Sequence, residues 1–407
     1  MGYLPRSIES TILDISQYYA AIIVTGPRQV GKTTTLQKLA DYKRGYVTLD
    51  DIEARRMAQS DPELFLSLHP APVLIDEVQY APELFSRVKI EIDRGAAPGS
   101  FWLTGSQTFR LMELAQESLA GRAALLRMAP LSQNEIYGRG GDTPFVPDFD
   151  SLKHRAASGS KTDTAGQYGR IWKGSLPGYI SGKFPKRDTF YSSYISMYIE
   201  RDVGDLVSRA DKLLFPDFIR AAACRTGQML VVHDIAKDVG VSDDTAKRWL
   251  GILEKSGVIF YLRPYSSNLL KRTIKAPKMY FFDTGIVAYI TRYATPEILM
   301  NGAINGAILE NYVVAEILKT YSNNGLECIA HYYRDKDGKE IDMIIESNGE
   351  LLPIEIKKVA SPPAGLVSGF KAIDKASLPR GQGAIICTKQ DFSAIDRSTA
   401  IVPAWTI

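Results

Sequence analysis

The stretch from residue 21 to residue 40, AIIVTGPRQVGKTTTLQKLA, constrains the fold of this chain more than any other. Its first five residues are apolar or β-branched and predict a buried strand, and apolar residues at helical spacing follow position 32. Between them, GPRQVGKT fits the pattern G-x-x-x-x-G-K-[ST] of a phosphate-binding loop, or P-loop. The two glycines let backbone N–H groups surround an anion, and the N-terminus of the helix adds partial positive charge. The sequence therefore predicts a phosphate site between a strand and a helix.

The residue types in this loop predict individual roles. We expect Lys32 to reach the β- and γ-phosphates and the Thr33 hydroxyl to ligate Mg²⁺. A chance glycine turn before a helix is the alternative, and the order of strand, loop and helix disfavours it. The remaining predicted nucleotide contacts are Gly26, Pro27, Arg28, Gln29, Val30, Gly31 and Thr34.

Two further predicted strands end in polar residues. PVLIDEVQ (72–79) predicts a short buried strand that ends at Asp76 and Glu77. We expect Asp76 to hold Mg²⁺ through water, and Glu77 to orient and deprotonate the attacking water. SFWLTGS (100–106) predicts another strand, at whose end Thr104 or Ser106 could sense the γ-phosphate. Ordinary core strands are the alternative, but two adjacent carboxylates after an apolar strand need a partner.

These motifs, with LAGR (119–122), PLS (130–132) and YIERD (198–202), resemble the AAA-type P-loop ATPases. The resemblance is closest to bacterial and archaeal members in which a domain of unknown function follows the ATPase, and it covers most of the chain. It implies ATP and Mg²⁺ as cofactors, a helical lid, and a homo-oligomer such as a hexameric ring. In such rings an arginine reaches the nucleotide of the neighbouring subunit, and Arg122 is the candidate. A surface arginine paired with Asp or Glu is the alternative.

Composition bounds the remaining possibilities. A chain of 407 residues predicts two to four domains, and a net charge of +3 favours no particular partner. The three cysteines are far apart and the four histidines are scattered, so neither a disulfide framework nor a zinc site is expected. No apolar run approaches the roughly 18 residues of a membrane helix, and the first ten residues have no apolar signal core. We therefore expect a soluble cytoplasmic protein without a membrane partner.

The expected fold class is α/β, with boundaries that follow shifts in composition and pattern. Strands that alternate with helices predict a parallel sheet covered on both faces. From 138 to 169 the chain is rich in Gly, Ser, Thr, Asp and Pro, which predicts a flexible linker or insertion, with an ordered loop as the alternative. The predicted segments are a P-loop ATPase core at 1–137, the linker at 138–170, a helical lid at 171–212, a winged helix-turn-helix at 213–265, a basic connector at 266–304 and a second α/β domain at 305–407.

The winged-helix prediction rests on a pattern of helix, turn, helix and hairpin, in which Ser242 caps the second helix. Such domains bind DNA or act as protein-interaction modules, and both interpretations stay open. Basic side chains without acidic neighbours recur from 263 to 278, as phosphate contacts require, although a solvated loop would also carry them. The predicted DNA-binding residues are Lys247, Arg248, Arg263, Lys271, Arg272 and Lys275.

A second candidate site lies near the C-terminus, where a helix is followed by strands at 329–334, 340–346 and 351–359. Asp342 lies in the second strand, and Glu355 and Lys357 share one face of the third because side chains alternate. Glu310 could join them from the helix. Carboxylates hold Mg²⁺, the metal acidifies water, and a lysine stabilises developing phosphorane charge.

The order Glu, Asp, Glu-x-Lys on α-β-β-β-α-β resembles the PD-(D/E)XK nuclease superfamily. Twelve residues separate Asp342 from Glu355, as in archaeal Holliday-junction resolvases, whereas Ile341 stands where many members have Pro. The resemblance implies a restriction-endonuclease-like fold, a metal site at Glu310, Asp342 and Glu355, and branched DNA as substrate. A structural sheet with surface ion pairs is the alternative.

Three functions therefore stay open: an ATP-driven machine that moves on or cuts DNA, an ATP-dependent switch with an inert nuclease-like domain, and a scaffold whose ATP site controls assembly.

Overall fold

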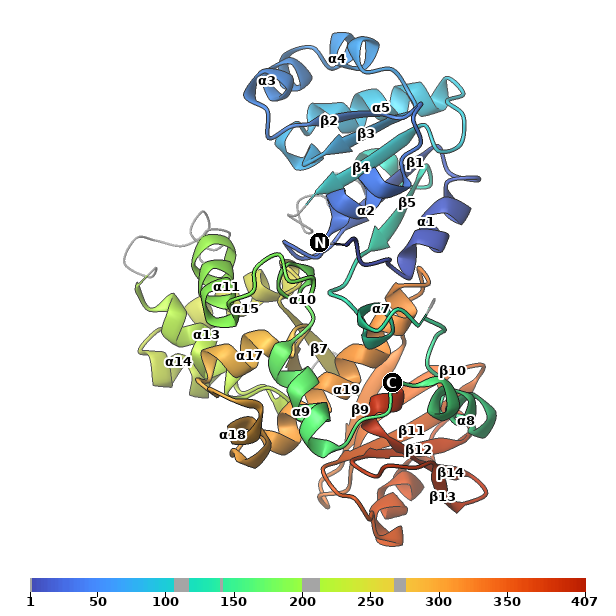
Figure 1. The fold of residues 1–407 in the computed structure, drawn as a ribbon, viewed down its shortest axis with the longest axis vertical. Helices are drawn as coiled ribbons and strands as arrows, with labels where there is room; N and C mark the ends of the chain where they lie inside the picture. Colours follow the sequence, from blue (N-terminus) through green and yellow to red (C-terminus); the bar gives the residue numbers. More distant parts are fainter. Residues whose placement is uncertain (1, 106–116, 140–141, 200–212, 267–275) are drawn as a thin grey trace.

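The computed structural model of the chain describes residues 2–105, 117–139, 142–199, 213–266 and 276–407. Figure 1 shows the N-terminal part, in blue and cyan, as a lobe of its own above a larger lobe that contains the rest of the chain. Within the described ranges, no helix is both long and apolar enough to cross a membrane.

The N-terminal lobe is built on a five-stranded sheet in the order β2-β3-β4-β1-β5, and every pairing is parallel. The predicted parallel sheet is thus confirmed. All five residues of β1 are buried, which is why this strand is an unbroken apolar run. The elements are α1 (Ile8–Ile15), β1 (Ala21–Thr25), α2 (Lys32–Leu39), β2 (Gly45–Thr48), α3 (Ile52–Ser60), α4 (Pro62–Leu68), β3 (Val73–Asp76), η1 (Val78–Tyr80), α5 (Glu83–Asp93), β4 (Phe101–Gly105) and β5 (Ala123–Arg127).

The prediction of a flexible linker at 138–170 is wrong for those of its residues that the structure describes. This segment contains two capped helices, and Phe145, Leu152 and Tyr168 have no exposed surface. The sparse apolar residues suffice because Leu152 and Tyr168 lie on the buried faces of α8 and α9 and Phe145 is buried in the segment before α8. The elements from here to the end of the predicted lid are α7 (Gln133–Ile136), α8 (Phe149–Ser158), α9 (Thr164–Lys173), α10 (Pro177–Ile180), α11 (Arg187–Tyr194) and a π-helical turn, η2 (Ile195–Ile199).

A nine-stranded sheet runs through the larger lobe in the order β13-β14-β12-β11-β10-β9-β7-β8-β6. Strand β7 pairs in parallel with β9, with Arg263 opposite His331. The predicted connector at 266–304 is therefore wrong as a description of this region, because β8 is a strand of the shared sheet. The strands are β6 (Gln228–Met229), β7 (Ile259–Pro264), β8 (Lys278–Phe281), β9 (Ala330–Arg334), β10 (Glu340–Ser347), β11 (Glu350–Lys357), β12 (Gly383–Cys387), β13 (Ser393–Asp396) and β14 (Thr399–Pro403).

Helices cover this sheet, and the longest of them, α19 (Asn305–Ser322), is almost entirely buried. Its Asn311 accepts from the N–H of Phe281 and donates to the carbonyl of the same residue, which fixes the helix against β8. The other helices of the lobe are α13 (Phe215–Ala223), α14 (Val232–Val239), α15 (Asp243–Lys255), α17 (Thr284–Ile290), α18 (Pro296–Asn301), η4 (Ala364–Ile373) and η5 (Ala404–Thr406).

Candidate functional site

The P-loop curls around the amino group of Lys32. Its Nζ donates to the carbonyl oxygens of Gly26 and Pro27 at 2.9 and 2.8 Å. Gly31 has a φ of 94°, and Gly26 has a φ of 149° where an added Cβ would lie 2.1 Å from the Met128 carbonyl oxygen. Only glycine fits both positions, because one is left-handed and the other touches backbone. The loop therefore has the shape that an anion-binding nest requires.

Thr33 and Asp76 meet at the carboxyl edge of the sheet. The Thr33 hydroxyl donates to Asp76 Oδ1 at 2.9 Å, and the Tyr46 hydroxyl lies 3.4 Å from Oδ2. Burial raises the pKa of Asp76, and the Thr33 hydrogen bond opposes that rise. A hydroxyl beside a carboxylate is the donor set that Mg²⁺ takes next to a triphosphate. These residues fit Mg²⁺, and the two glycines and Lys32 fit the phosphates.

Three further groups face the same edge. The hydroxyls of Thr25 and Thr104 are buried and have no hydrogen-bond partner among the described residues. Glu77 follows β3 with a left-handed φ of 55°, and its carboxylate accepts from Gln79 Nε2. The geometry brings Thr104 and Glu77 to the P-loop edge, whereas the predicted Ser106 lies outside the described residues. A non-glycine residue at positive φ is a strained position of the kind found at functional sites.

Residues from outside the nucleotide loop hold it in place. Arg6 donates to the carbonyl oxygens of Val30 and Ala129 at 2.6 and 2.8 Å and forms an ion pair with Glu135 at 3.0 Å. From the larger lobe, the Tyr194 hydroxyl lies 3.4 Å from the carbonyl oxygen of Arg28. The predicted site thus has a second wall that belongs to the larger lobe. The sequence gives no signal for Arg6, which precedes every motif.

Arg122 lies at the opposite edge of the sheet from the P-loop. It directly precedes β5, whose first residue pairs with Ala21 and whose last pairs with Thr25, so about 16 Å of strand separates it from the loop. Its guanidinium binds Asp93 with Nε at 2.6 Å from Oδ1 and Nη2 at 3.2 Å from Oδ2. Both side chains are partly exposed. A contact of Arg122 with the nucleotide of its own chain is incompatible with this position.

The predicted DNA-binding residues fall into two groups. Lys247 and Arg248 are exposed on α15, and Lys247 pairs with Asp244 at 3.6 Å. Arg263 is exposed on β7, which puts it on the hairpin formed by β7 and β8. Lys271, Arg272 and Lys275 belong to the connection between these two strands and lie outside the described residues.

The C-terminal candidate residues do come together, but with an additional lysine. Lys357 Nζ lies 3.1 Å from Asp342 Oδ2 and 3.0 Å from Glu355 Oε1. Lys278 Nζ, from β8, lies 2.9 Å from Glu310 Oε1 and 3.6 Å from Asp342 Oδ1. We call these five side chains, together with Glu340, the carboxylate cluster. In the sequence, Lys278 is the last of the basic side chains that recur from 263 to 278, although the apolar run MYF after it is a signal for a buried strand.

The pKa values in this cluster are strongly perturbed. Burial raises the pKa of Glu310 and of Glu355 to about 7, and the negative charge of Asp342 adds to the rise in both. Burial opposes the charge on Lys278, yet Glu310, Asp342 and Glu340 together raise its pKa above the ordinary value. Among the described residues, no group of three or more His, Cys, Asp or Glu side chains is arranged to hold a metal ion. The cluster as it stands does not fit Mg²⁺, because ammonium groups take up its oxygens.

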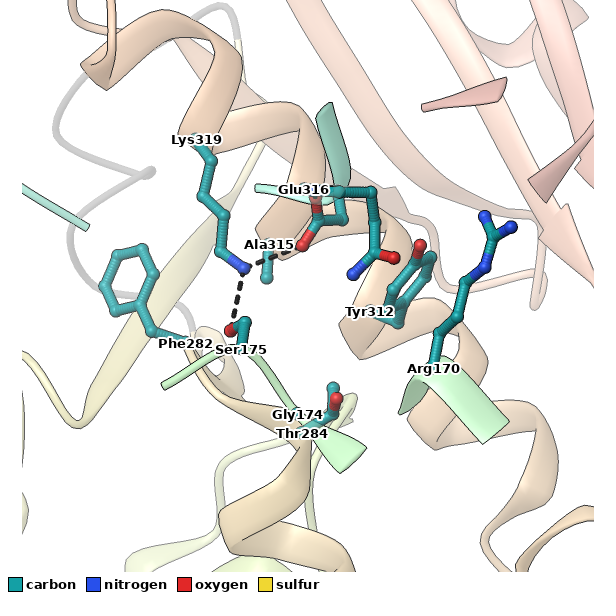
Figure 2. A pocket seen from close by; sticks show the side chains of 10 residues that line it. Arg170, Gly174, Ser175, Phe282, Thr284, Tyr312, Ala315, Glu316 and Lys319 are labelled. Atoms are coloured by element: carbon teal, nitrogen blue, oxygen red, sulfur yellow. Dashed lines mark hydrogen bonds and ion pairs between the residues drawn. The ribbon is translucent and has the colours of Figure 1, made fainter. Parts of the chain in front are cut away.

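A small polar cavity lies in the larger lobe beside α19, where α7 and the end of α9 meet this helix. Figure 2 shows Lys319 pointing at Glu316 and Ser175, with Tyr312 and Arg170 on the far side. Lys319 Nζ donates to Glu316 Oε1 at 2.7 Å, and Glu316 Oε2 accepts from the backbone N–H of Gln133 at 2.9 Å. The space is about 10 Å³, which is room for about one water molecule. The helix that carries Glu310 is thus bonded directly to the segment that follows β5.

Comparison with known proteins agrees with the first of these sites. Residues 18–137 match the family model described as "AAA domain", so the N-terminal lobe is an AAA-type P-loop ATPase domain. Residues 167–297 and 305–407 match two models, each described as a domain of unknown function (DUF8612 and DUF4143). These last two matches assign no activity to the larger lobe.

Two relatives match most of this chain. Uncharacterized proteins of Mycobacterium bovis and Mycobacterium tuberculosis are each 28% identical over 346 residues, which is 84% of this chain and 71% of theirs. A Walker-type ATPase of Pyrococcus abyssi aligns at a TM-score of 0.45 and 13% identity, covering 70% of this chain and 94% of that one. A DNA replication initiation factor aligns at a TM-score of 0.29 and 14% identity, covering 61% and 86%. At these TM-scores the likeness supports no functional conclusion.

Proposed function

We propose that this protein hydrolyses ATP and acts on nucleic acid. One observation carries the ATPase part: Lys32, the Thr33–Asp76 pair and Glu77 meet at one sheet edge around a loop shaped for phosphates. Lys32 would leave its loop carbonyls for the β- and γ-phosphates, which offer it a full negative charge. Thr33 and Asp76 would hold Mg²⁺, which neutralises phosphate charge when bound. Glu77 would accept the proton of the attacking water.

The nucleic-acid part rests on the larger lobe. The order α13, β6, α14, α15, β7, β8 is that of a winged helix, with the β7–β8 hairpin as its wing. The wing would carry Arg263 and the basic residues 271, 272 and 275 to DNA phosphates. The test is ATP turnover by the full chain with no DNA and with linear, forked and four-way DNA. Stimulation by DNA is the expected result, and equal turnover in all four samples would contradict a DNA-coupled ATPase.

An oligomer is the third part of the proposal. Since Arg122 is far from the P-loop of its own chain, a role in hydrolysis requires a neighbouring subunit. A homo-oligomer such as a ring would place Arg122 of one subunit at the nucleotide of the next. Sedimentation with and without ATP tests this, and a monomer under both conditions would exclude a role of Arg122 in hydrolysis.

A second candidate function is an ATP-dependent switch that binds a protein through the winged helix, with an inert nuclease-like domain. The charge on α14, α15 and the turn between them favours it. The acidic side chains there outnumber the Lys and Arg side chains. Binding of DNA phosphates would need an excess of Lys and Arg. The acidic side chains are Asp234, Asp238, Asp243, Asp244 and Glu254 against Lys237, Lys247, Arg248 and Lys255. DNA binding that survives loss of Lys247 and Arg248 but not loss of the wing residues would leave this face for a protein.

A further inference from the structure

The ammonium group of Lys278 is enclosed by the acidic residues of the carboxylate cluster. Besides Glu310 and Asp342, its Nζ contacts Glu340 Oε1 at 2.7 Å. The ring of Tyr332 lies beneath it, with the centroid 5.7 Å from Nζ. The Lys278 side chain is only 4% exposed. Residues from α19, β9 and β10 therefore surround one cation that β8 supplies.

We propose that Lys278 takes the place of a divalent metal ion in this cluster. The ion pairs of the cluster then link β8 to the strands β10 and β11, and we call this set of ion pairs the ionic joint. The cluster binds no Mg²⁺ while β8 is paired in the sheet. This inference goes beyond the proposed function, because neither ATP hydrolysis nor DNA contact depends on it.

The distances favour an ammonium group over a metal. Separations of 2.7 and 2.9 Å from Glu340 and Glu310 are those of charge-assisted N–H···O bonds, whereas Mg²⁺ needs oxygens at about 2.0–2.1 Å in near-octahedral array. A metal ion bound to Glu310 Oε1 and Asp342 Oδ1 together would come into the space around Nζ. Two cations in that space would repel each other, so one of them must leave.

The opposite side of the cluster is closed as well. Asp342 Oδ2 accepts from the N–H of Ile356 at 2.8 Å and from Lys357 Nζ, which also binds Glu355 Oε1. Glu355 Oε2 is buried without a hydrogen-bond partner among the described residues. One carboxylate oxygen does not hold Mg²⁺ by itself, since that ion keeps six ligands. Both oxygens of Asp342, the residue between the two lysines, thus already face a lysine.

The strand that carries Lys278 is fixed within the sheet. Its backbone pairs with Leu262 on β7 and with Met229 on β6, so its Cα is held from both sides. The contacts with Glu310, Glu340 and Asp342 and the low exposure of the side chain then keep the ammonium group in the cluster. The ionic joint therefore ties the wing, whose loop connects β7 to β8, to the strands that carry Asp342 and Glu355.

The test is Mn²⁺ binding by the full chain without nucleotide, followed by the loss of the electron paramagnetic resonance signal of free Mn²⁺. Wild type and the Asp342→Asn variant should bind equally little. Lys278→Met should bind Mn²⁺ at least about tenfold more tightly than wild type, and Asp342→Asn in the same chain should abolish the gain. The matched control is Lys358→Met, because Lys358 donates to the Met300 carbonyl and not to a carboxylate. It should bind like wild type.

Two results would overturn the proposal. The first is Mn²⁺ binding by wild type that Asp342→Asn removes, and this result does not depend on whether Lys278→Met folds. The second is a folded Lys278→Met chain, verified by circular dichroism, that gains no Mn²⁺ binding. Failure of DNA to stimulate ATP turnover would refute the proposed function and leave this inference intact, since no nucleotide or DNA enters the Mn²⁺ measurement.

Discussion

Pro27, in the nucleotide-binding loop, packs against Gly257, in the turn between α15 and β7. A Cβ added at Gly257 would lie 2.8 Å from Pro27 Cγ and 3.1 Å from Cδ. The turn between α15 and β7 therefore touches the P-loop directly, and a change in the loop on ATP binding would reach the start of β7.

This contact predicts that Gly257→Ala impairs ATP binding. The added methyl group must displace Pro27, and Gly257 also has a positive φ of 73°, which costs an L-residue about 1–2 kcal/mol. Gly240→Ala is the matched control, because Gly240 has a φ of 78° with nothing within 4 Å of its added Cβ. We expect calorimetric titration to show ATP binding weakened by about tenfold in Gly257→Ala only. Equal ATP affinity in the two variants would contradict coupling through this contact.

The P-loop assignment predicts two separable defects. Lys32→Ala should lose nucleotide binding, because the phosphates lose their main positive partner. Glu77→Gln should bind ATP but not hydrolyse it, because the amide cannot accept the proton of water. Filter binding of labelled ATP and release of phosphate measure the two steps. Normal turnover in Glu77→Gln would remove this residue from the mechanism.

The position of Arg122 predicts a defect that a second chain can rescue. Arg122→Ala should keep ATP binding while turnover falls by about 10³-fold or more. Mixing it with Glu77→Gln should restore some turnover, since an intact Glu77 can then face an intact Arg122 of another subunit. Asp93→Ala tests the ion pair and should retain turnover if Arg122 serves the neighbour. If Asp93→Ala instead matches Arg122→Ala, the pair with Asp93 has a structural role.

The ion pair in Figure 2 predicts a large loss of stability on removal of one partner. Lys319 and Glu316 are 1% and 3% exposed, so Lys319→Met leaves a buried carboxylate without its cation. Denaturant unfolding should show a loss of about 3–5 kcal/mol. The double variant with Glu316→Gln should recover part of it, because the amide oxygen still accepts from Gln133. Equal stability of the single and double variants would show that the charge is not the cause.

The N-terminal lobe could be predicted from its sequence because each of its signals is local. The run AIIVT before the P-loop, the run VLID and the run FWLTG predict short strands followed by polar residues, and β1, β3 and β4 match them closely. What could not be predicted is the second wall of the site. Tyr194 and Gly257 lie more than 150 residues after the loop, and nothing in their sequence neighbourhood shows what they touch.

The prediction of a flexible linker at 138–170, made from composition, was wrong for a related reason. Few apolar residues occur there, but Phe145, Leu152 and Tyr168 each find a buried position that other parts of the chain provide. The same holds for Lys278, which stands near a basic run in the sequence yet lies among carboxylates in space. Strand alternation did place Glu355 and Lys357 together, because that relationship depends on two residues of one strand.

The pairing of β7 with β9 joins segments that match two different family models, 167–297 and 305–407, into one sheet. Neither segment is then a free-standing module. A chain that stops at residue 304 would expose β7 as an open edge and lose α19, which packs on β8. Such edges recruit other chains. The two segments should therefore be inherited together, melt in a single cooperative transition, and aggregate when they are separated.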